Sequence, residues 1–195
     1  MNCRKKYIWI NFLFIHLFIT NVSFAQKPVF GLKLGLAVSH SAIDENSTDP
    51  NSGSGINGVG IIGGVYLDIP LANEVVFRPG AEIVSKGKNR INGYFYYPAR
   101  FTYVDIPLNV FFKDNSSHGH LIAGGGPALG IPFRPTYGYA LKTDIGLNGI
   151  IGYEFPVGFS FNVNYCYGLN NISKNQDAAK KISTRYLGIT AGYSF

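Results

Sequence analysis

Apolar side chains occupy every second position at the end of the chain. Leu187, Ile189, Ala191, Tyr193 and Phe195 alternate with small or polar residues over 185–195. An alternation with a period of two residues predicts a β-strand that has one apolar face. The same pattern recurs upstream and predicts seven further strands, at residues 30–39, 59–69, 75–86, 101–112, 120–131, 144–154 and 158–169. Three consecutive glycines at 124–126 leave the facing of the 120–131 strand open.

The segments between these predicted strands alternate in length. Long connections at about 40–57, 87–100, 132–143 and 170–183 alternate with short turns at 70–73, 113–119 and 155–157. Outer-membrane barrels have short periplasmic turns and longer extracellular loops, and strands of roughly ten residues cross the hydrocarbon core when tilted. The pattern therefore predicts an all-β fold, an eight-stranded antiparallel up-and-down transmembrane β-barrel. We expect it in the outer membrane of a Gram-negative bacterium, with both termini periplasmic.

A soluble ligand-binding barrel is the alternative, because alternation does not say which face points outward. The second face of the predicted strands is largely Gly, Ala, Ser and Asn, with a few charges of both signs. Small residues suit the interior of a small barrel, whereas a water-facing surface would carry dense Lys and Glu. Aromatic residues also gather near strand ends, as membrane-interface girdles do. These residues are Phe30, Phe101, Tyr103, Phe155, Tyr193 and Phe195. The membrane barrel is favoured.

The start of the chain has the organisation of a secretory signal peptide. Three basic residues at 4–6 precede a mostly apolar run at 7–24, and a small-x-small cleavage site ends at Ala25. An uncleaved membrane-anchor helix is the less favoured alternative. We expect a cleavable signal peptide at 1–25 and a barrel domain at 26–195.

Composition agrees with an exported membrane barrel. Charged residues make up 14% of the chain, below the usual quarter, while aromatic residues reach 15% and there are 24 glycines. The chain has 17 Lys+Arg and 11 Asp+Glu, and three of the basic residues lie in the first 25, which leaves the remainder at +3. The remaining basic residues are scattered, so nucleic-acid binding is not expected. Only Cys166 would survive cleavage, which excludes an intramolecular disulfide.

Charged residues on the predicted inner face are the best candidates for a specific role. They are Lys33, Asp68, Arg78, Glu82, Lys86, Asp105, Asp144 and Glu154. Side chains fill the interior of an eight-stranded barrel, and charges there must be paired or hydrated. We expect a salt-bridge network that plugs the lumen, in which Glu82 or Asp105 pairs with Arg78, Lys86 or Lys33. A narrow gated pore and catalysis in or above the barrel are the alternatives.

Two further motifs are only weak indications of a nucleotide site and a metal site. Residues 58–63 match G-x-G-x-x-G, but a nucleotide site needs a strand before and a helix after, and here a strand is predicted to follow. His118 and His120 lie in a polar turn without a third metal ligand nearby in sequence. No Ser/His/acid set with a recognisable spacing is present. We therefore expect no metal, no cofactor and no enzymatic activity.

The stretch YVDIPL at 103–108 resembles the aromatic-x-acid-Ile-Pro-Leu strand of the PorT-type outer-membrane barrels of Bacteroidetes. Shorter stretches at 64–67, 82–87, 126–127, 144–147 and 167–172 resemble further segments of that family in the same order. The resemblance covers nearly the whole predicted barrel domain and implies an eight-stranded barrel. It implies no reaction, although PorT itself is similar to an accessory part of a protein-secretion system.

Three classes of function follow from these patterns. The first is a monomeric structural or interaction protein that presents four extracellular loops to an envelope or secretion-complex protein. The others are a small channel and a membrane-embedded enzyme acting on lipid or lipopolysaccharide. We expect the first. The further partners would be outer-membrane lipids, lipopolysaccharide and the barrel-assembly machinery, which would read Tyr193 and Phe195 in the last strand.

Overall fold

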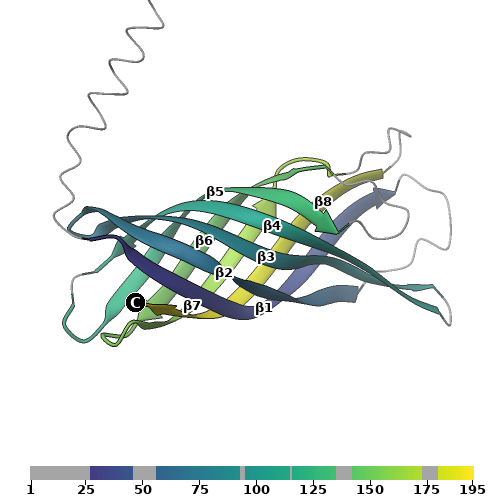
Figure 1. Ribbon diagram of the computed structural model, residues 1–195. Coiled ribbons are helices and arrows are strands. Elements are labelled where there is room, and N and C mark those ends of the chain that lie inside the picture. The colour runs from purple at the N-terminus through teal and green to yellow at the C-terminus, as the bar shows by residue number, and fades with distance from the viewer. Residues whose placement is uncertain (1–26, 46–55, 93–94, 115, 135–141, 173–179) are drawn as a thin grey trace, which may run out of the picture.

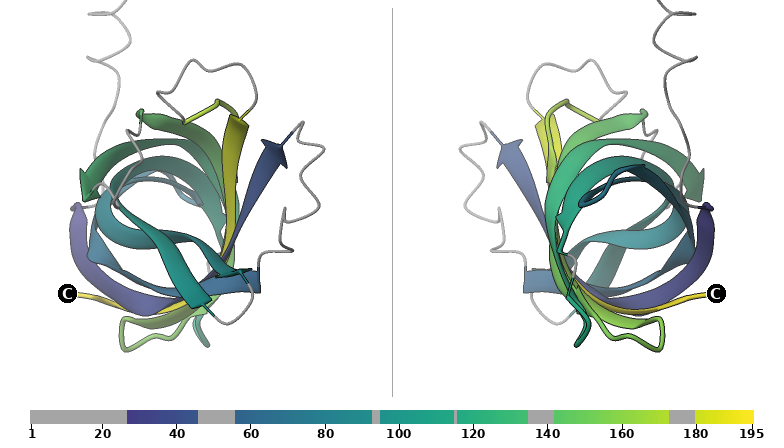
Figure 2. Two further views of the ribbon diagram at one scale, coloured as in Figure 1. Left: turned by 90° about the vertical axis from the view of Figure 1, so that its right-hand side faces the viewer. Right: turned by 90° about the vertical axis from the view of Figure 1, so that its left-hand side faces the viewer.

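A computed structural model describes residues 27–45, 56–92, 95–114, 116–134, 142–172 and 180–195. These residues form eight strands: β1 (Val29–Glu45), β2 (Ile56–Ala72), β3 (Val75–Asn92), β4 (Phe95–Lys113), β5 (His120–Arg134), β6 (Asp144–Glu154), β7 (Phe159–Gly168) and β8 (Lys180–Ser194). The strands follow one another around a closed barrel (Figures 1 and 2). The predicted signal peptide lies outside the described residues. Within them, no helix is long and apolar enough to cross a membrane.

Every neighbouring pair of strands is antiparallel, and β1 pairs with β8 from Gly31↔Ser194 to Glu45↔Lys180. The seam between the first and last strands is also bridged by a side chain. The Tyr66 ring of β2 lies over Gly31 of β1, where any Cβ would overlap the ring, and its hydroxyl is 3.0 Å from the Ser194 hydroxyl of β8. The predicted all-β, eight-stranded antiparallel barrel is confirmed.

The outward face carries the large apolar side chains. Leu34, Ile189 and Phe161 are 65%, 62% and 52% exposed, while the alternate positions on their strands point inward. The facing of β5, left open by its three glycines, follows the same alternation. Ile122, Ala128 and Gly130 are buried, whereas Leu121, Leu129 and Ile131 are exposed. The chain therefore turns its apolar face outward, as a barrel embedded in lipid requires.

Two of the six aromatic residues assigned to an interface girdle were assigned wrongly. Phe101 and Tyr103 are 3% and 0% exposed and lie inside the barrel, because they share the inward face of β4 with Asp105. The other four are on the outside at the end with the short turns. Phe195 stacks on Phe30 with ring centres 5.9 Å apart and meets Tyr193 edge-on, and Phe155 belongs to a second ring cluster with Tyr153, Phe159 and Phe161.

The strands at the opposite end are longer than alternation predicted. The clearest case is the connection predicted at 87–100, where β3 and β4 instead continue to the pair Asn92↔Phe95 and leave only residues 93–94 between them. Tyr and Phe at 95–97 favour strands, so composition misled the loop assignment. Pro79 has no backbone N–H to donate to a neighbouring strand. The pairing of β3 with β2 skips Arg78 and Pro79 and resumes in the same register.

Candidate functional site

All eight predicted lumen charges point into the barrel and are nearly enclosed. None of their side chains is more than 8% exposed. They form three groups at successive levels along the lumen, from the end with the short turns to the opposite end.

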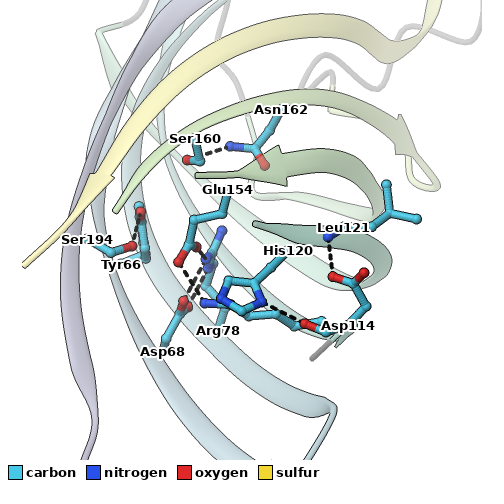
Figure 3. A network of polar contacts seen from close by, with 11 residues as sticks. Tyr66, Asp68, Arg78, Asp114, His120, Leu121, Glu154, Ser160, Asn162 and Ser194 are labelled. Atoms are coloured by element: carbon cyan, nitrogen blue, oxygen red, sulfur yellow. Dashed lines mark hydrogen bonds and ion pairs between the residues drawn. The ribbon is translucent and has the colours of Figure 1, made fainter. Parts of the chain in front are cut away.

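Arg78 is the centre of the group nearest the short turns (Figure 3). Its Nε and Nη2 donate to the two carboxylate oxygens of Asp68 at 2.5 and 2.6 Å, and Nη2 lies 3.8 Å from Glu154. The Lys113 ammonium completes the group by donating to the other oxygen of Glu154 at 2.7 Å. The guanidinium is packed between the rings of Tyr66 and Phe111, 4.1 and 4.5 Å from their centres. Such a bidentate, ring-stacked pair fixes the arginine in place.

Lys33 and Glu82 form an ion pair at the middle level. They sit on strands two apart, β1 and β3, and both face Gly64 of the strand between them in the register. A Cβ at Gly64 would lie 2.6 Å from the Cβ of Glu82 and closer still to the Ala81 carbonyl. The glycine therefore leaves the space across which the lysine reaches the carboxylate.

Lys86 is shared by two carboxylates at the third level. Its ammonium is 2.7 Å from Asp105 of β4 and 3.0 Å from Asp144 of β6. Gly130 of β5 stands between these aspartates in the register and keeps the space above it free of a side chain. Thr184 donates to the same Asp144 oxygen at 2.6 Å. The Tyr103 and Tyr186 rings flank the ammonium at 4.9 and 5.5 Å.

All the charged residues expected in the lumen form ion pairs, but only some of them pair with an expected partner. Glu82 pairs with Lys33 and Asp105 with Lys86, as two of the expected combinations, while Arg78 pairs with Asp68 rather than Glu82. Lys113 was missed because the predicted strand stopped at residue 112. One more step of the alternation would have placed it on the inner face. Thr184 was missed because the predicted last strand began at residue 185.

The part of the lumen lined by β7, β8 and the middle of β6 carries amides and hydroxyls. Asn148 donates to Asn109 at 3.1 Å, and Asn162 donates to Ser160 at 3.2 Å. Among the described residues, no protein group donates to the side-chain carbonyl oxygens of Asn148, Asn162 and Asn164. The lumen thus has a charged side, built by β1 to β4 with Asp144 and Glu154 at the two ends of β6, and an uncharged polar side on β7 and β8.

The G-x-G-x-x-G stretch and the two histidines form neither a nucleotide site nor a metal site among the described residues. The G-x-G-x-x-G stretch lies within β2, with no helix after it, and Gly58 and Gly60 are buried. The His120 ring nitrogen Nδ1 contacts the Asp114 carbonyl oxygen at 2.7 Å, and His118 contacts Ser117, so both serve the turn. No three His, Cys, Asp or Glu side chains of the described segments are placed to hold a metal ion.

Comparison with known proteins agrees with this architecture. A family model described as an outer membrane protein beta-barrel domain matches residues 24–174. The chain belongs to this family. The match confirms the outer-membrane β-barrel domain that the sequence resemblance implied, and it places the barrel in the outer membrane.

Two solved structures share the fold. Neisserial surface protein A is 12% identical with a TM-score of 0.54, and the match covers 87% of this chain and 100% of that one. The outer membrane protein AlkL, solved in lipid bilayers, is 10% identical with a TM-score of 0.52, covering 87% and 91%. No curated protein matches the sequence. At these identities the likeness establishes the fold, that of a small eight-stranded outer-membrane barrel, and nothing about the role.

Proposed function

We propose that this protein is a non-enzymatic interaction protein anchored in the outer membrane, with its lumen closed and its long-strand end presented outside the cell. The observation that carries the proposal is the stack of three buried ion-pair groups around Arg78, Lys33 and Lys86. Side chains already fill most of an eight-stranded barrel, and paired charges at three levels leave little continuous passage.

The presented end is the part of the barrel that exceeds what spanning a membrane requires. The β3–β4 hairpin adds six register pairs beyond Lys86↔Phe101, from Gly87↔Arg100 to Asn92↔Phe95. The β1–β8 pairing likewise continues to Glu45↔Lys180. Paired strands hold a binding surface more rigidly than a loop of equal length would. An envelope or secretion-complex protein, the partner class implied by the PorT-type resemblance, is the first to test.

Conductance separates this proposal from a pore. Purified protein inserted into planar bilayers is expected to produce no current steps, with insertion checked on protein-containing vesicles from the same preparation. Regular steps would favour the second candidate, a narrow gated pore. That candidate is supported by the uncharged wall, where the Asn162 and Asn164 carbonyl oxygens have no donor among the described residues.

A hairpin truncation tests the interaction role directly. Replacing residues 88–99 by Asn-Gly joins Gly87 to Arg100, which face each other in the register, through a favoured two-residue turn. The matched control keeps both strands and changes only residues 93–94 to Asn-Gly. We expect both variants to fold, and only the truncation to lose the protein crosslinked to the wild type in native outer membranes. Equal crosslinking by both variants would reject the hairpin as the binding element.

The orientation is tested by labelling single cysteines on whole cells with an impermeant maleimide. In a Cys166→Ser background, a cysteine at residue 51, outside the described residues, is expected to react. A cysteine at Ser116, in the turn between β4 and β5, is expected to be protected. Reaction at position 116 without reaction at 51 would invert the proposed orientation.

A further inference from the structure

The outward face carries a groove across the seam where β1 meets β8. It has a volume of about 460 Å³. Its lining is apolar throughout and consists of Leu34, Gly35, Leu36, Val38, Val59, Phe161, Leu187, Ile189 and Ala191. The groove exists because Ala191 places a methyl group where its neighbours across both strands, Leu34 and Phe161, carry large side chains. From Leu34 to Val38 it extends roughly 13 Å along the strand, at about 3.3 Å per residue.

A basic side chain stands at one end of this groove. Arg185 is the next outward-facing residue of β8 after Leu187, and its guanidinium carbon lies 4.8 Å from the centre of the Tyr167 ring. Its Nε is enclosed and has no hydrogen-bond partner within the described part of the chain, where no carboxylate pairs with it either. The arginine is therefore held in position by an aromatic ring, and no carboxylate of the described side chains matches its charge.

Arg185 lies at the height where lipid headgroups begin. It is ten residues before Phe195 on the same face of β8, and a strand tilted by 35–45° rises about 25 Å over that length. The apolar band of an outer-membrane barrel is also about 25 Å tall. Since the Phe195, Phe30 and Tyr193 rings mark one boundary, Arg185 and Tyr167 mark the other. An arginine facing outward costs little at such a boundary and is expensive near the midplane.

We propose that the groove and Arg185 together bind one phosphorylated, acylated lipid. An acyl chain lies along Leu34, Leu36 and Ile189, and a phosphate of the headgroup meets the Arg185 guanidinium, whose planar fork of donors suits phosphate oxygens. This assignment rests on the proposed function, in which the long-strand end lies outside the cell. Arg185 then lies at the outer leaflet, and the ligand is the lipid A part of lipopolysaccharide. A second barrel packed on this face would bring an apolar surface and leave the guanidinium without an anion.

The test measures retention of lipid A by the purified barrel in native mass spectrometry, after incubation in nanodiscs of zwitterionic phospholipid. We expect one lipid A molecule per wild-type barrel and about tenfold weaker retention by Arg185→Gln, the usual scale for loss of a charge-assisted hydrogen bond. Lipid A from which the phosphates have been removed should be retained equally, and weakly, by both proteins. Ala191→Leu, which fills the groove, should also weaken retention of lipid A.

Ala123→Leu is the matched control, since Ala123 faces outward on β5, on the far wall of the barrel from the seam. It should retain lipid A as the wild type does. Equal retention by Arg185→Gln and wild type, or equal losses from Ala191→Leu and Ala123→Leu, would overturn the site. The dephosphorylated-lipid comparison on wild type decides the phosphate requirement even if a variant does not fold. Preferential retention of phosphatidylglycerol would overturn the assignment to lipid A, while conductance and hairpin crosslinking report on the proposed function separately.

Discussion

The Lys33–Glu82 pair offers the sharpest test of the lumen network, because each partner forms a single ion pair among the described residues. Their side chains are 8% and 2% exposed, so Glu82→Gln leaves a lysine charge enclosed without its partner. Breaking a buried pair from one side typically costs about 3–5 kcal/mol, whereas replacing both members by uncharged groups of similar size is often close to neutral. We therefore expect Glu82→Gln and Lys33→Met each to lower the unfolding free energy by about 3–5 kcal/mol. The double variant should lose less than either single variant.

The assay is urea unfolding of the refolded barrel in detergent, followed by the shift in gel mobility between folded and unfolded forms. The control cycle combines Glu82→Gln with Arg78→Gln. Because Arg78 pairs with Asp68 and Glu154 instead, those two losses should add. Additive losses in the Lys33–Glu82 cycle, or coupling in the control cycle, would refute the Lys33–Glu82 pairing.

Three further outcomes are expected. Gly64→Ala should destabilise the barrel in the same urea assay, since the added Cβ would lie 2.6 Å from the Cβ of Glu82. Gly63→Ala should be tolerated, because the nearest atom to its Cβ is 3.4 Å away on the Leu34 side chain. Equal effects of the two variants would show that the spacing at Gly64 is not critical. Lys86→Met should lower the unfolding free energy more than Lys33→Met does, because Asp105 and Asp144 lose the same cation and then repel each other. An equal or smaller loss of unfolding free energy would argue against a lysine shared by two carboxylates. Deleting Phe195 removes ring contacts worth about 2–3 kcal/mol. If assembly machinery reads the last strand, the deletion should reduce the amount of folded protein in outer membranes more than it reduces the refolding yield in detergent. Normal amounts in the membrane would contradict this.

Strand facing was predictable from the sequence because alternation with a period of two records it locally. The assignment went wrong where a second rule competed with the alternation. Tyr103 lies two residues from Asp105 on the inward face, yet its place near a strand end and its aromatic ring suggested an interface girdle. A ring at a strand end can serve either the membrane boundary or the lumen, and parity along the strand is what distinguishes the two.

The identity of the lumen charges was predictable, but their pairing was not. Which charges meet depends on the register between strands and on what stands between the two partners. Gly64 and Gly130 occupy the intervening positions for the second and third groups, and neither carries a signal that separates it from the other glycines of the chain. The length of the β3–β4 hairpin was missed for a different reason, because polar residues at 87–92 suggested a loop.

The Tyr66 bridge to Ser194 joins residues 128 positions apart, across the contact between the first and last strands. The β1–β8 contact that it spans joins the two strands farthest apart in the sequence, so the entropy of bringing the chain ends together must be overcome before the bridge forms. Until that moment the sheet is open, and an ion pair such as Lys33–Glu82 is exposed to water, where it contributes little. Closure of the seam therefore converts weak surface pairs into enclosed ones in one step. The charges consequently act late in folding, penalising any register in which they fail to find their partners when the lumen shuts.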